Sequence, residues 1–311
     1  MFSVLVLLST YNGEKYLREQ LDSILNQHGV SVNILVRDDG SVDKTRQILS
    51  EYIEIYHNIT YVFGKNIGFV KSFSELIRMS LSYIPTPEYL DFCDQDDIWF
   101  PNKLLAACMQ LEKMDKRKPN LFSHNSIIID EKGDKTTIYH RSPPRYTRGN
   151  VMVYSTEQGC CMVFNRVAVE LYNQNLPTIT WHDRWMYLIC YYLGDVQYFQ
   201  KPLISYRVHH ENALAINKYK SSKAFPFKLF SFLPSLKLPQ YTLHSDMAKE
   251  FLDNFGSKIQ EKDKKLFFIF TTYKTSIISK FKFLASKEFL SPTGGMKNRI
   301  RQIIYVMIKK L

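Results

Sequence analysis

The chain has 311 residues, of which 45% are apolar, 23% are charged and 14% are aromatic. This is the composition of a folded protein, and it excludes a disordered chain, a collagen-like chain and a small domain held together by disulfides. The length suits about two domains, or one large domain with an appendage.

The positive charge is concentrated in the last third of the sequence, although the formal net charge of the whole chain is +11. Residues 1–210 contain 22 Lys and Arg and 23 Asp and Glu, whereas residues 211–311 contain 19 and 7. The net charges of the two parts are therefore −1 and +12. This pattern predicts a near-neutral body with a basic C-terminal region, and it argues against a nucleic-acid partner, which favours a basic surface throughout.

Cysteine content and hydropathy indicate the compartment. Five cysteines without a C-x-x-C spacing predict buried, reduced thiols. The apolar N-terminus is short and lacks a basic leader, which predicts a buried strand rather than a signal peptide. No run of about 18 apolar residues occurs, so no membrane-spanning helix is expected. We expect a cytoplasmic protein, with at most a peripheral attachment to the inner face of the plasma membrane.

Strand patterns and helix patterns alternate through the first part of the chain. Strand patterns cover residues 2–8, 32–36, 60–63 and 89–93, and helical spacing recurs over residues 17–25, 43–52 and 69–81. A further helical run is expected from Ile98. Strands that alternate with helices of this length predict parallel βαβ units, and so an α/β fold with a mostly parallel central sheet flanked by helices.

The alternation loosens after this point. Strands are expected over residues 122–129 and 136–139, and residues 159–164 form another apolar run. A helix is expected over 182–193, and two final strands over 196–199 and 203–208. Residues 218–228 are then basic and aromatic, and residues 241–311 predict helices with Lys-rich faces.

Polar clusters follow three of the expected strands, at Thr10-Tyr11-Asn12, Asp38-Asp39 and residues 94–97. Because ligands bind outside the carboxyl ends of parallel strands, we expect these clusters to share one site. An aromatic face and a carboxylate that accepts a nucleobase N–H suit a nucleotide, and Lys71 is placed to reach a phosphate. Each cluster alone also has a simpler explanation, as a turn, a helix cap or a solvated lysine.

The third cluster is strongly acidic, with four carboxylates in seven residues, at Asp91, Asp94, Asp96 and Asp97. Like charges this close raise each other's pKa unless a cation is present. Mn²⁺ or Mg²⁺ resolves the conflict, because such ions typically take one or two carboxylates together with substrate phosphates. The candidate metal ligands are Asp96 and Asp97. The alternative is a solvated acidic turn or a helix cap.

Two more clusters lie in the second half. Asp183 is at the start of an expected helix, where the helix dipole keeps a carboxylate ionised and able to accept a proton. His182 precedes it. Arg207 suits a diphosphate bidentately, and His209 suits a phosphate or a metal. A helix cap and a surface turn are the alternatives.

Taken together, these motifs resemble those of family 2 glycosyltransferases with the GT-A nucleotide-sugar fold. The resemblance is carried by residues 8–13, 37–41, 66–68, 94–104, 159–161, 182–183 and 206–209. Within the family it is most similar to bacterial rhamnosyltransferases of capsule, O-antigen and cell-wall polysaccharide assembly. Trp181 and Arg184 depart from the pattern around His182 and Asp183, which leaves the donor sugar and the acceptor open.

The resemblance implies a GT-A catalytic domain over residues 1–215. Its nucleotide-binding half would cover about residues 1–115 and its acceptor half residues 116–215. A helical, basic C-terminal extension follows over residues 216–311.

The resemblance also implies roles for individual residues. Tyr11 and Asp39 would hold the base, Thr10 would line its pocket, Asp94 would contact the ribose, and Asp96 would bind the metal that bridges the diphosphate, with Asp97 as the second candidate. Asp183 would deprotonate the acceptor hydroxyl and His182 would position it, while Arg207 and His209 would steady the departing nucleoside diphosphate. The remaining donor-binding candidates are Asn12, Asp38, Lys71 and Gln95.

The expected function is therefore that of an inverting glycosyltransferase that depends on Mn²⁺ or Mg²⁺. It would move a sugar from a nucleotide-sugar donor, dTDP-rhamnose favoured, to a hydroxyl of a growing surface polysaccharide or a lipid-linked oligosaccharide. UDP-glucose and UDP-galactose are alternative donors. The alternative from another class is a non-catalytic scaffold at a membrane surface.

The basic C-terminal region suits a membrane surface. Residues 297–311 place apolar side chains on one helical face with Lys and Arg on its flanks. A basic amphipathic helix of this kind predicts attachment to an anionic inner leaflet. Packing of the same helix on the catalytic body is the alternative, and the oligomeric state stays open.

Overall fold

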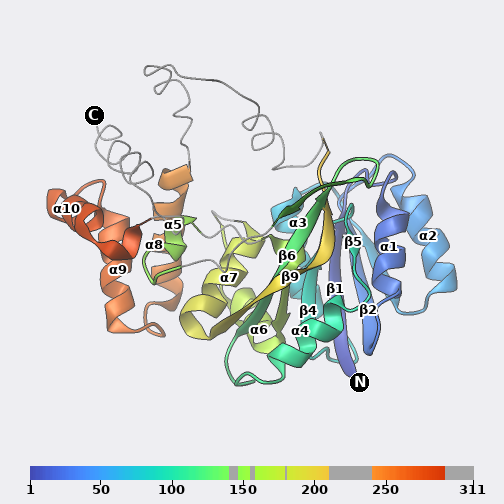
Figure 1. Ribbon diagram of the computed structural model, residues 1–311, viewed down its shortest axis with the longest axis horizontal. Coiled ribbons are helices and arrows are strands. Elements are labelled where there is room, and N and C mark those ends of the chain that lie inside the picture. The colour runs from blue at the N-terminus through green and yellow to red at the C-terminus, as the bar shows by residue number, and fades with distance from the viewer. Residues whose placement is uncertain (140–145, 155–157, 179–180, 210–239, 291–311) are drawn as a thin grey trace, which may run out of the picture.

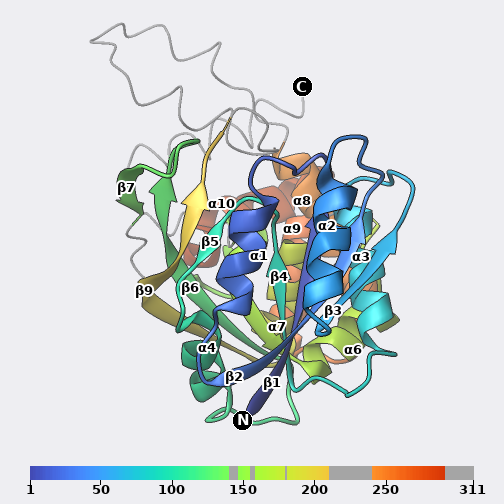
Figure 2. The same cartoon turned by 90° about the vertical axis from the view of Figure 1, so that its right-hand side faces the viewer.

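The computed structural model describes residues 1–139, 146–154, 158–178, 181–209 and 240–290 (Figure 1). A nine-stranded sheet forms its centre, in the order β3-β2-β1-β4-β8-β6-β9-β5, with β7 paired to β6. Helices lie on both faces of this sheet (Figure 2). The α/β fold expected from the sequence is confirmed.

The first half of the sheet is parallel, as predicted. Its strands are β1 (Phe2–Thr10), β2 (Val30–Asp38), β3 (Ile59–Phe63) and β4 (Tyr89–Cys93). The helices that connect them are α1 (Leu17–Leu25), α2 (Thr45–Ile55) and α3 (Phe69–Ser80). Residues from Val4 to Leu8 of β1 are fully buried, because helices cover both faces of a parallel sheet.

The second half of the sheet mixes strand directions. Its strands are β5 (Ile98–Trp99), β6 (Asn120–Ile129), β7 (Lys135–Tyr139), β8 (Met162–Asn165) and β9 (Asp195–Arg207). Strand β8 is antiparallel to both β4 and β6, and β9 is parallel to β6. The helices are α4 (Lys103–Leu111), α5 (Val151–Tyr154), α6 (Arg166–Gln174) and α7 (His182–Leu193), with a 3₁₀ turn η1 (Gly159–Cys161).

The helix expected from Ile98 is a wrong prediction. Ile98 and Trp99 form β5, which pairs antiparallel with β9, and α4 begins only at Lys103. Pro101 lies between the two elements. The apolar side chains at this point therefore serve the sheet edge rather than a helix face.

The expectation of two final strands is also wrong. Segments 196–199 and 203–208 belong to one strand, β9, whose register against β6 shifts on either side of Asn125. Pro202, which cannot donate to the ladder, lies at this irregularity and divides the sequence pattern. Helix α6, which begins after the capping side chain of Asn165, was not predicted at all.

Two apolar clusters fill the two sides of the sheet. Val4, Val6 and Leu8 of β1 face α1, α2 and α4, whereas Leu5 and Leu7 face α3, α6 and α7. This alternation follows from the two-residue period of a strand. All five cysteines are buried thiols, as predicted.

The described C-terminal helices pack on the body. They are α8 (Gln240–Phe255), α9 (Glu261–Thr272) and α10 (Ile277–Ala285). Trp185 of α7 contacts Phe251 and Phe255 of α8, with ring centroids 5.4 and 6.0 Å apart, and all three belong to one apolar cluster. The proposed boundary at residue 215 and the basic segments 218–228 and 297–311 lie outside the described residues.

A buried ion pair fastens α9 to the rest of the molecule. Arg148 donates from Nε and Nη2 to the two carboxylate oxygens of Asp263, at 3.0 and 2.5 Å. The Asp263 side chain is fully buried. Arg148 also donates from Nη1 to the Tyr191 carbonyl oxygen at 2.9 Å, which extends the connection to α7.

Asp263→Ala should lower the free energy of unfolding by about 2–3 kcal/mol, because it leaves the partly buried Arg148 guanidinium without its counter-ion. Urea unfolding of the full chain measures this loss. Glu261→Ala is the matched control in the same helix turn, since it breaks only an exposed pair with Lys264 and should cost less than about 1 kcal/mol. Equal losses in the two variants would contradict the role given to the ion pair between Arg148 and Asp263.

Candidate active site

The carboxyl ends of β1, β2 and β4 meet at one edge of the sheet, and the predicted polar clusters lie there. Thr10 and Asp38 end their strands as register partners. The Asp39 amide donates to the Thr10 carbonyl oxygen at 2.8 Å. Asp94 follows directly on β4. The parallel topology thus brings the three clusters to a common edge.

Asp38 is fully buried and holds the loops around it. Its carboxylate accepts hydrogen bonds from Thr10 Oγ1 at 3.2 Å, the Ser41 amide at 3.1 Å and Arg46 Nε at 2.9 Å, and also from the Ser41 hydroxyl. Both oxygens are therefore engaged by donors of the protein. This residue organises the edge rather than presenting an open carboxylate to a ligand.

Asp39 is joined to a residue that the sequence analysis missed. Its Oδ1 atom lies 2.6 Å from Arg37 Nη1, and its two oxygens accept from the amides of Ile67 and Gly68, both at 2.9 Å. Gly68 has φ +83°, a conformation that favours glycine. Arg37 also donates to Ser72 Oγ at 3.0 Å. The position of Arg37 directly before Asp38 and Asp39, at the end of a strand, is the sequence signal that could have identified this residue.

Gln95 connects the first cluster to the third. Its side-chain amide accepts from the Tyr11 amide at 2.8 Å and donates to the Tyr11 carbonyl oxygen at 3.0 Å, while the Tyr11 side chain stays 47% exposed. A Cβ atom on Gly13 would lie 2.6 Å from Gln95 Cδ, which explains the glycine. Asn12 adopts φ 48° and donates its amide to Ser41 Oγ at 2.9 Å.

Lys71 lies exposed in the first turn of α3. It directly precedes Ser72, the residue that contacts Arg37. Its predicted contact with a phosphate stays a prediction.

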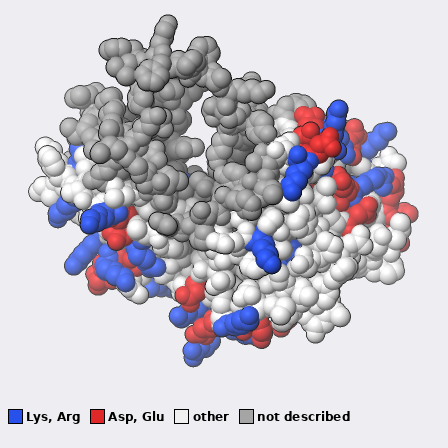
Figure 3. Space-filling model, in the orientation of Figure 1, with Lys and Arg blue, Asp and Glu red and all other residues white. Residues whose placement is uncertain are grey.

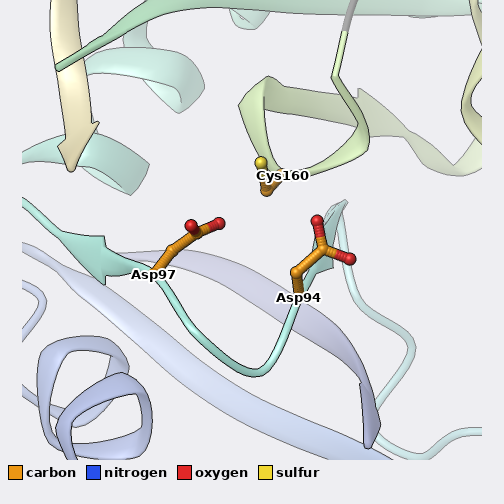
Figure 4. Close-up of side chains that lie close together, drawn as sticks. All are labelled: Asp94, Asp97 and Cys160. Carbon is orange, nitrogen blue, oxygen red and sulfur yellow. The ribbon is translucent and has the colours of Figure 1, made fainter. Parts of the chain in front are cut away.

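Asp94, Asp97 and Cys160 form a cluster that could hold a metal ion (Figure 4). One ligand atom from each lies within 4.8 Å of the others. The two carboxylates come from the loop after β4, and Cys160 of η1 lies on the same side of this loop as both of them. The sequence analysis had placed Asp94 on the ribose side and had not considered Cys160, because the sequence does not show that η1 lies over this loop.

The electrostatics of this cluster fit a divalent cation. Burial, with the neighbouring Asp96 and Asp183 carboxylates, raises the pKa of Asp94 to about 7, and burial raises the pKa of Asp97 well above its usual range. Asp97 Oδ1 accepts from the Arg207 amide at 3.0 Å, whereas its buried Oδ2 has no hydrogen-bond partner within the described part of the chain. A divalent cation would relieve this repulsion and supply the missing partner.

Asp96, the other predicted metal ligand, lies beside this cluster but is paired. Its Oδ2 atom lies 2.7 Å from His209 Nε2, and both side chains are almost fully buried. The His209 ring packs on Tyr16, with centroids 5.1 Å apart. Two residues to which the sequence analysis gave separate roles, metal and diphosphate, therefore contact one another.

Arg207 is committed to the protein rather than open to a ligand. Its side chain is 2% exposed. Nε donates to the Asp96 carbonyl oxygen at 2.9 Å, Nη1 reaches two carbonyl oxygens of the β6–β7 turn at 3.3 Å, and Nη2 contacts Glu19 Oε2 at 2.5 Å. In this arrangement the Arg207 guanidinium positions the acidic loop. Its expected contact with the diphosphate stays a prediction.

A second buried cation lies under the same loop. Lys103 Nζ is 2.5 Å from Asp91 Oδ2 and 3.2 Å from the centroid of the Trp99 ring, and the side chains of Lys103 and Asp91 are fully buried. Burial outweighs this pairing and raises the pKa of Asp91 to about 7. Of the four clustered carboxylates, Asp91 is thus a structural one.

Asp183 and His182 form the first turn of α7, as predicted. Burial raises the pKa of Asp183 to about 6, against the lowering effect of hydrogen bonding to its backbone neighbours. His182 stacks on Phe73, with centroids 3.9 Å apart, and meets the Phe92 ring edge-on at 4.8 Å. Burial lowers the pKa of His182 to about 3, so its ring is neutral at pH 7.

The comparisons with known proteins agree with this arrangement. Residues 5–174 match the sequence model of the family described as glycosyl transferase family 2, which is more than half of the chain. The chain belongs to this family. It is therefore a glycosyltransferase, and the family resemblance stated above is confirmed.

The sequence identity of the chain to individual relatives is low. The chain is 28% identical over 229 residues to dTDP-rhamnosyl transferase RfbG of Shigella flexneri, which covers 68% of this chain and 77% of that protein. It is 26% identical over 266 residues to an uncharacterised glycosyltransferase of Rickettsia typhi, and this match covers 81% of this chain and 78% of that protein.

Solved structures confirm the GT-A fold. S. aureus TarS 1–349 in complex with UDP-GlcNAc has a TM-score of 0.58 at 16% identity, over 98% of this chain and 80% of that one. GalNAc-T7 with UDP, GalNAc and Mn²⁺ has a TM-score of 0.53 at 13% identity, over 68% and 45%. At such identities the likeness concerns the fold alone.

We expect Asp97→Asn to weaken Mn²⁺ binding at least about tenfold, because it removes the buried, unpartnered oxygen of the cluster. Asp96→Asn should weaken it less, since that carboxylate pairs with His209. Isothermal titration of Mn²⁺ into each full-length variant measures this, with the partly exposed Asp115→Asn as the control. Loss of binding in Asp96→Asn alone would show that the ion lies on the His209 side instead.

Proposed function

We propose that the chain is an inverting glycosyltransferase that depends on a divalent cation, and that it uses a nucleotide-sugar donor to glycosylate a hydroxyl of a surface polysaccharide or lipid-linked oligosaccharide. The observation that carries the proposal is the cluster of Asp94 and Asp97 with Asp183 close enough to raise the pKa of Asp94. A site for a cation and a carboxylate that can act as a base thus lie at the same sheet edge.

The donor would lie along the edge formed by the three clusters. The exposure of Tyr11 supports a stacking role against the nucleobase of the donor. Arg37 holds the Asp39 carboxylate in place at the same sheet edge. Asp94 and Asp97 would hold Mn²⁺ or Mg²⁺, with Cys160 beside them. When bound, the ion would neutralise the charge that develops on the departing diphosphate.

Asp183 would accept the proton of the acceptor hydroxyl during attack. A pKa of about 6 keeps this carboxylate mostly ionised at neutral pH while leaving it a stronger base than an ordinary aspartate. One base suffices for inversion, because attack on the anomeric carbon from the side opposite the diphosphate requires no enzyme nucleophile. Neutral His182, packed between aromatic rings, would fix the first turn of α7 and so position Asp183.

The donor we favour is dTDP-rhamnose. The support for it is the likeness to a protein named dTDP-rhamnosyl transferase over 68% of this chain. UDP-glucose and UDP-galactose stay as the alternatives. Family membership argues against the non-catalytic scaffold. The presence of the carboxylates that catalysis would use is a second argument against it.

An acceptor carried on a lipid would bring the enzyme to the inner face of the plasma membrane. Within the described residues, no helix is long and apolar enough to cross a bilayer. Attachment would use a surface of the described residues or the basic segments beyond them.

Asp183→Asn should lower kcat by about 10³-fold while leaving nucleotide binding intact, because it removes only the proton acceptor. In the wild type, kcat/KM should fall about tenfold per pH unit below pH 6, where Asp183 becomes protonated. Steady-state transfer assays measure both. Asp195→Asn, at the exposed start of β9, is the control and should retain activity. A wild-type rate independent of pH between 5 and 7 would argue against this base.

A donor screen with Mn²⁺ tests the favoured substrate. We expect dTDP-rhamnose to give faster release of nucleoside diphosphate than UDP-glucose or UDP-galactose, by about 10-fold or more, a factor that a single sugar or base contact can supply. The measurement is the rate at which the enzyme releases nucleoside diphosphate from each donor. Faster turnover of either UDP-sugar would overturn the rhamnosyl assignment but not the transferase.

A further inference from the structure

The outer face of α10 is apolar and uncovered. Ile277, Ile278 and Phe281 are 71%, 68% and 69% exposed, which is unusual for side chains of this size. The inner face of the same helix buries Ser279 and Phe283. The helix thus presents three large apolar side chains outwards, and an exposed apolar surface marks a site of interaction.

Lysines border this apolar stripe on both sides. At 100° per residue, Lys280 and Lys282 fall on opposite flanks of the face that Ile277 and Phe281 form. The nine residues of α10 include no Asp or Glu. Basic side chains, with acidic ones among them, lie at this end of the molecule (Figure 3). We call Ile277, Ile278, Phe281, Lys280 and Lys282 the α10 patch.

The helix that carries the α10 patch is held firmly. The Phe283 ring stacks on Tyr273 at 5.0 Å between centroids and on Phe270 at 5.8 Å, and it packs on Phe289 at 4.6 Å. Thr272 Oγ1 also donates to Ser279 Oγ at 2.7 Å, which joins the end of α9 to α10. The stripe is therefore presented on a fixed base, remote from the sheet (Figure 1).

We propose that the α10 patch docks on an anionic lipid bilayer, with the helix lying in the plane of the surface. The three apolar side chains would enter the boundary between headgroups and acyl chains. The lysine stems would extend along the helix and bring their ammonium groups to the lipid phosphates. A patch without carboxylates suits a surface of uniform negative charge, because no part of it is repelled.

This inference deepens the proposed function, in that a lipid-linked acceptor would give the contact its use. The binding itself depends on α10 alone and not on the chemistry of the active site. It also differs from the attachment expected from residues 297–311, which lie outside the described residues. Vesicle binding and sugar transfer can therefore fail independently.

Flotation of the full chain with vesicles tests the proposal, using phosphatidylcholine with and without phosphatidylglycerol. We expect binding to the anionic vesicles only. The combined variant Ile277→Ser, Ile278→Ser and Phe281→Ser should bind about tenfold more weakly, because it removes the inserted apolar area. Ile55→Ser is the matched control, since Ile55 is 69% exposed on α2, and it should bind as the wild type does.

A second pair of variants separates charge from apolar contact. Lys280→Gln with Lys282→Gln should weaken binding to anionic vesicles by about tenfold at low salt and little at high salt. Lys113→Gln, exposed on the loop after α4, is the control. Lys282 and Lys113 are exposed and Lys280 is half-buried at the surface, so all variants should keep a thermal unfolding temperature close to that of the wild type.

Three results would overturn the proposal. The first is equal binding of the wild type and the combined apolar variant, which would place the membrane contact elsewhere in the chain. The second is no binding to anionic vesicles by any form. The third is a change from dimer to monomer in the combined variant on size exclusion with light scattering, without vesicle binding, which would make the patch a contact between copies of the chain.

Discussion

The acidic edge of the sheet keeps its shape because one buried guanidinium, that of Arg207, holds the loop between β4 and β5. It bonds the Asp96 carbonyl oxygen, contacts Glu19 of α1 and reaches the β6–β7 turn, while its backbone amide fixes the Asp97 carboxylate. A guanidinium can do this because its donors are spread around a rigid plane, whereas a lysine would offer a single charged point. The loop is thus tied to three separate parts of the fold at once.

The carboxylates of this edge fall into two groups according to their partners. Asp91 and Asp96 have cationic or imidazole partners inside the protein, and they build the loop. Asp94, Asp97 and Asp183 lie beside η1, and burial raises their pKa values as it raises that of Asp91. Burial of neighbouring acids costs stability, and it favours the binding of a proton or a cation.

The sequence was informative wherever local pattern decides structure. The apolar run of β1 predicted a buried parallel strand, and the polar residues after each strand predicted a shared edge. Side-chain direction within the loop after β4 was not predictable, so the sequence could not tell that Asp94 and Asp97 would lie together with Cys160 while Asp96 pairs with His209. The contact between Arg207 and Glu19 joins residues 188 positions apart in the sequence, so no local sequence pattern predicts it. The sequence therefore suggested a phosphate ligand at Arg207 without showing that its guanidinium also holds the acidic loop.

The packing of α8 on Trp185 ties the C-terminal helices to the chemistry. Trp185 follows the proposed base, Asp183, by two residues on the same helix turn, and its ring is covered by Phe251 and Phe255. Residues on both sides of the expected boundary at residue 215 therefore belong to one apolar cluster. An exchange of these helices between related transferases would replace the rings that cover Trp185, and so would change the packing of the helix turn that carries Asp183.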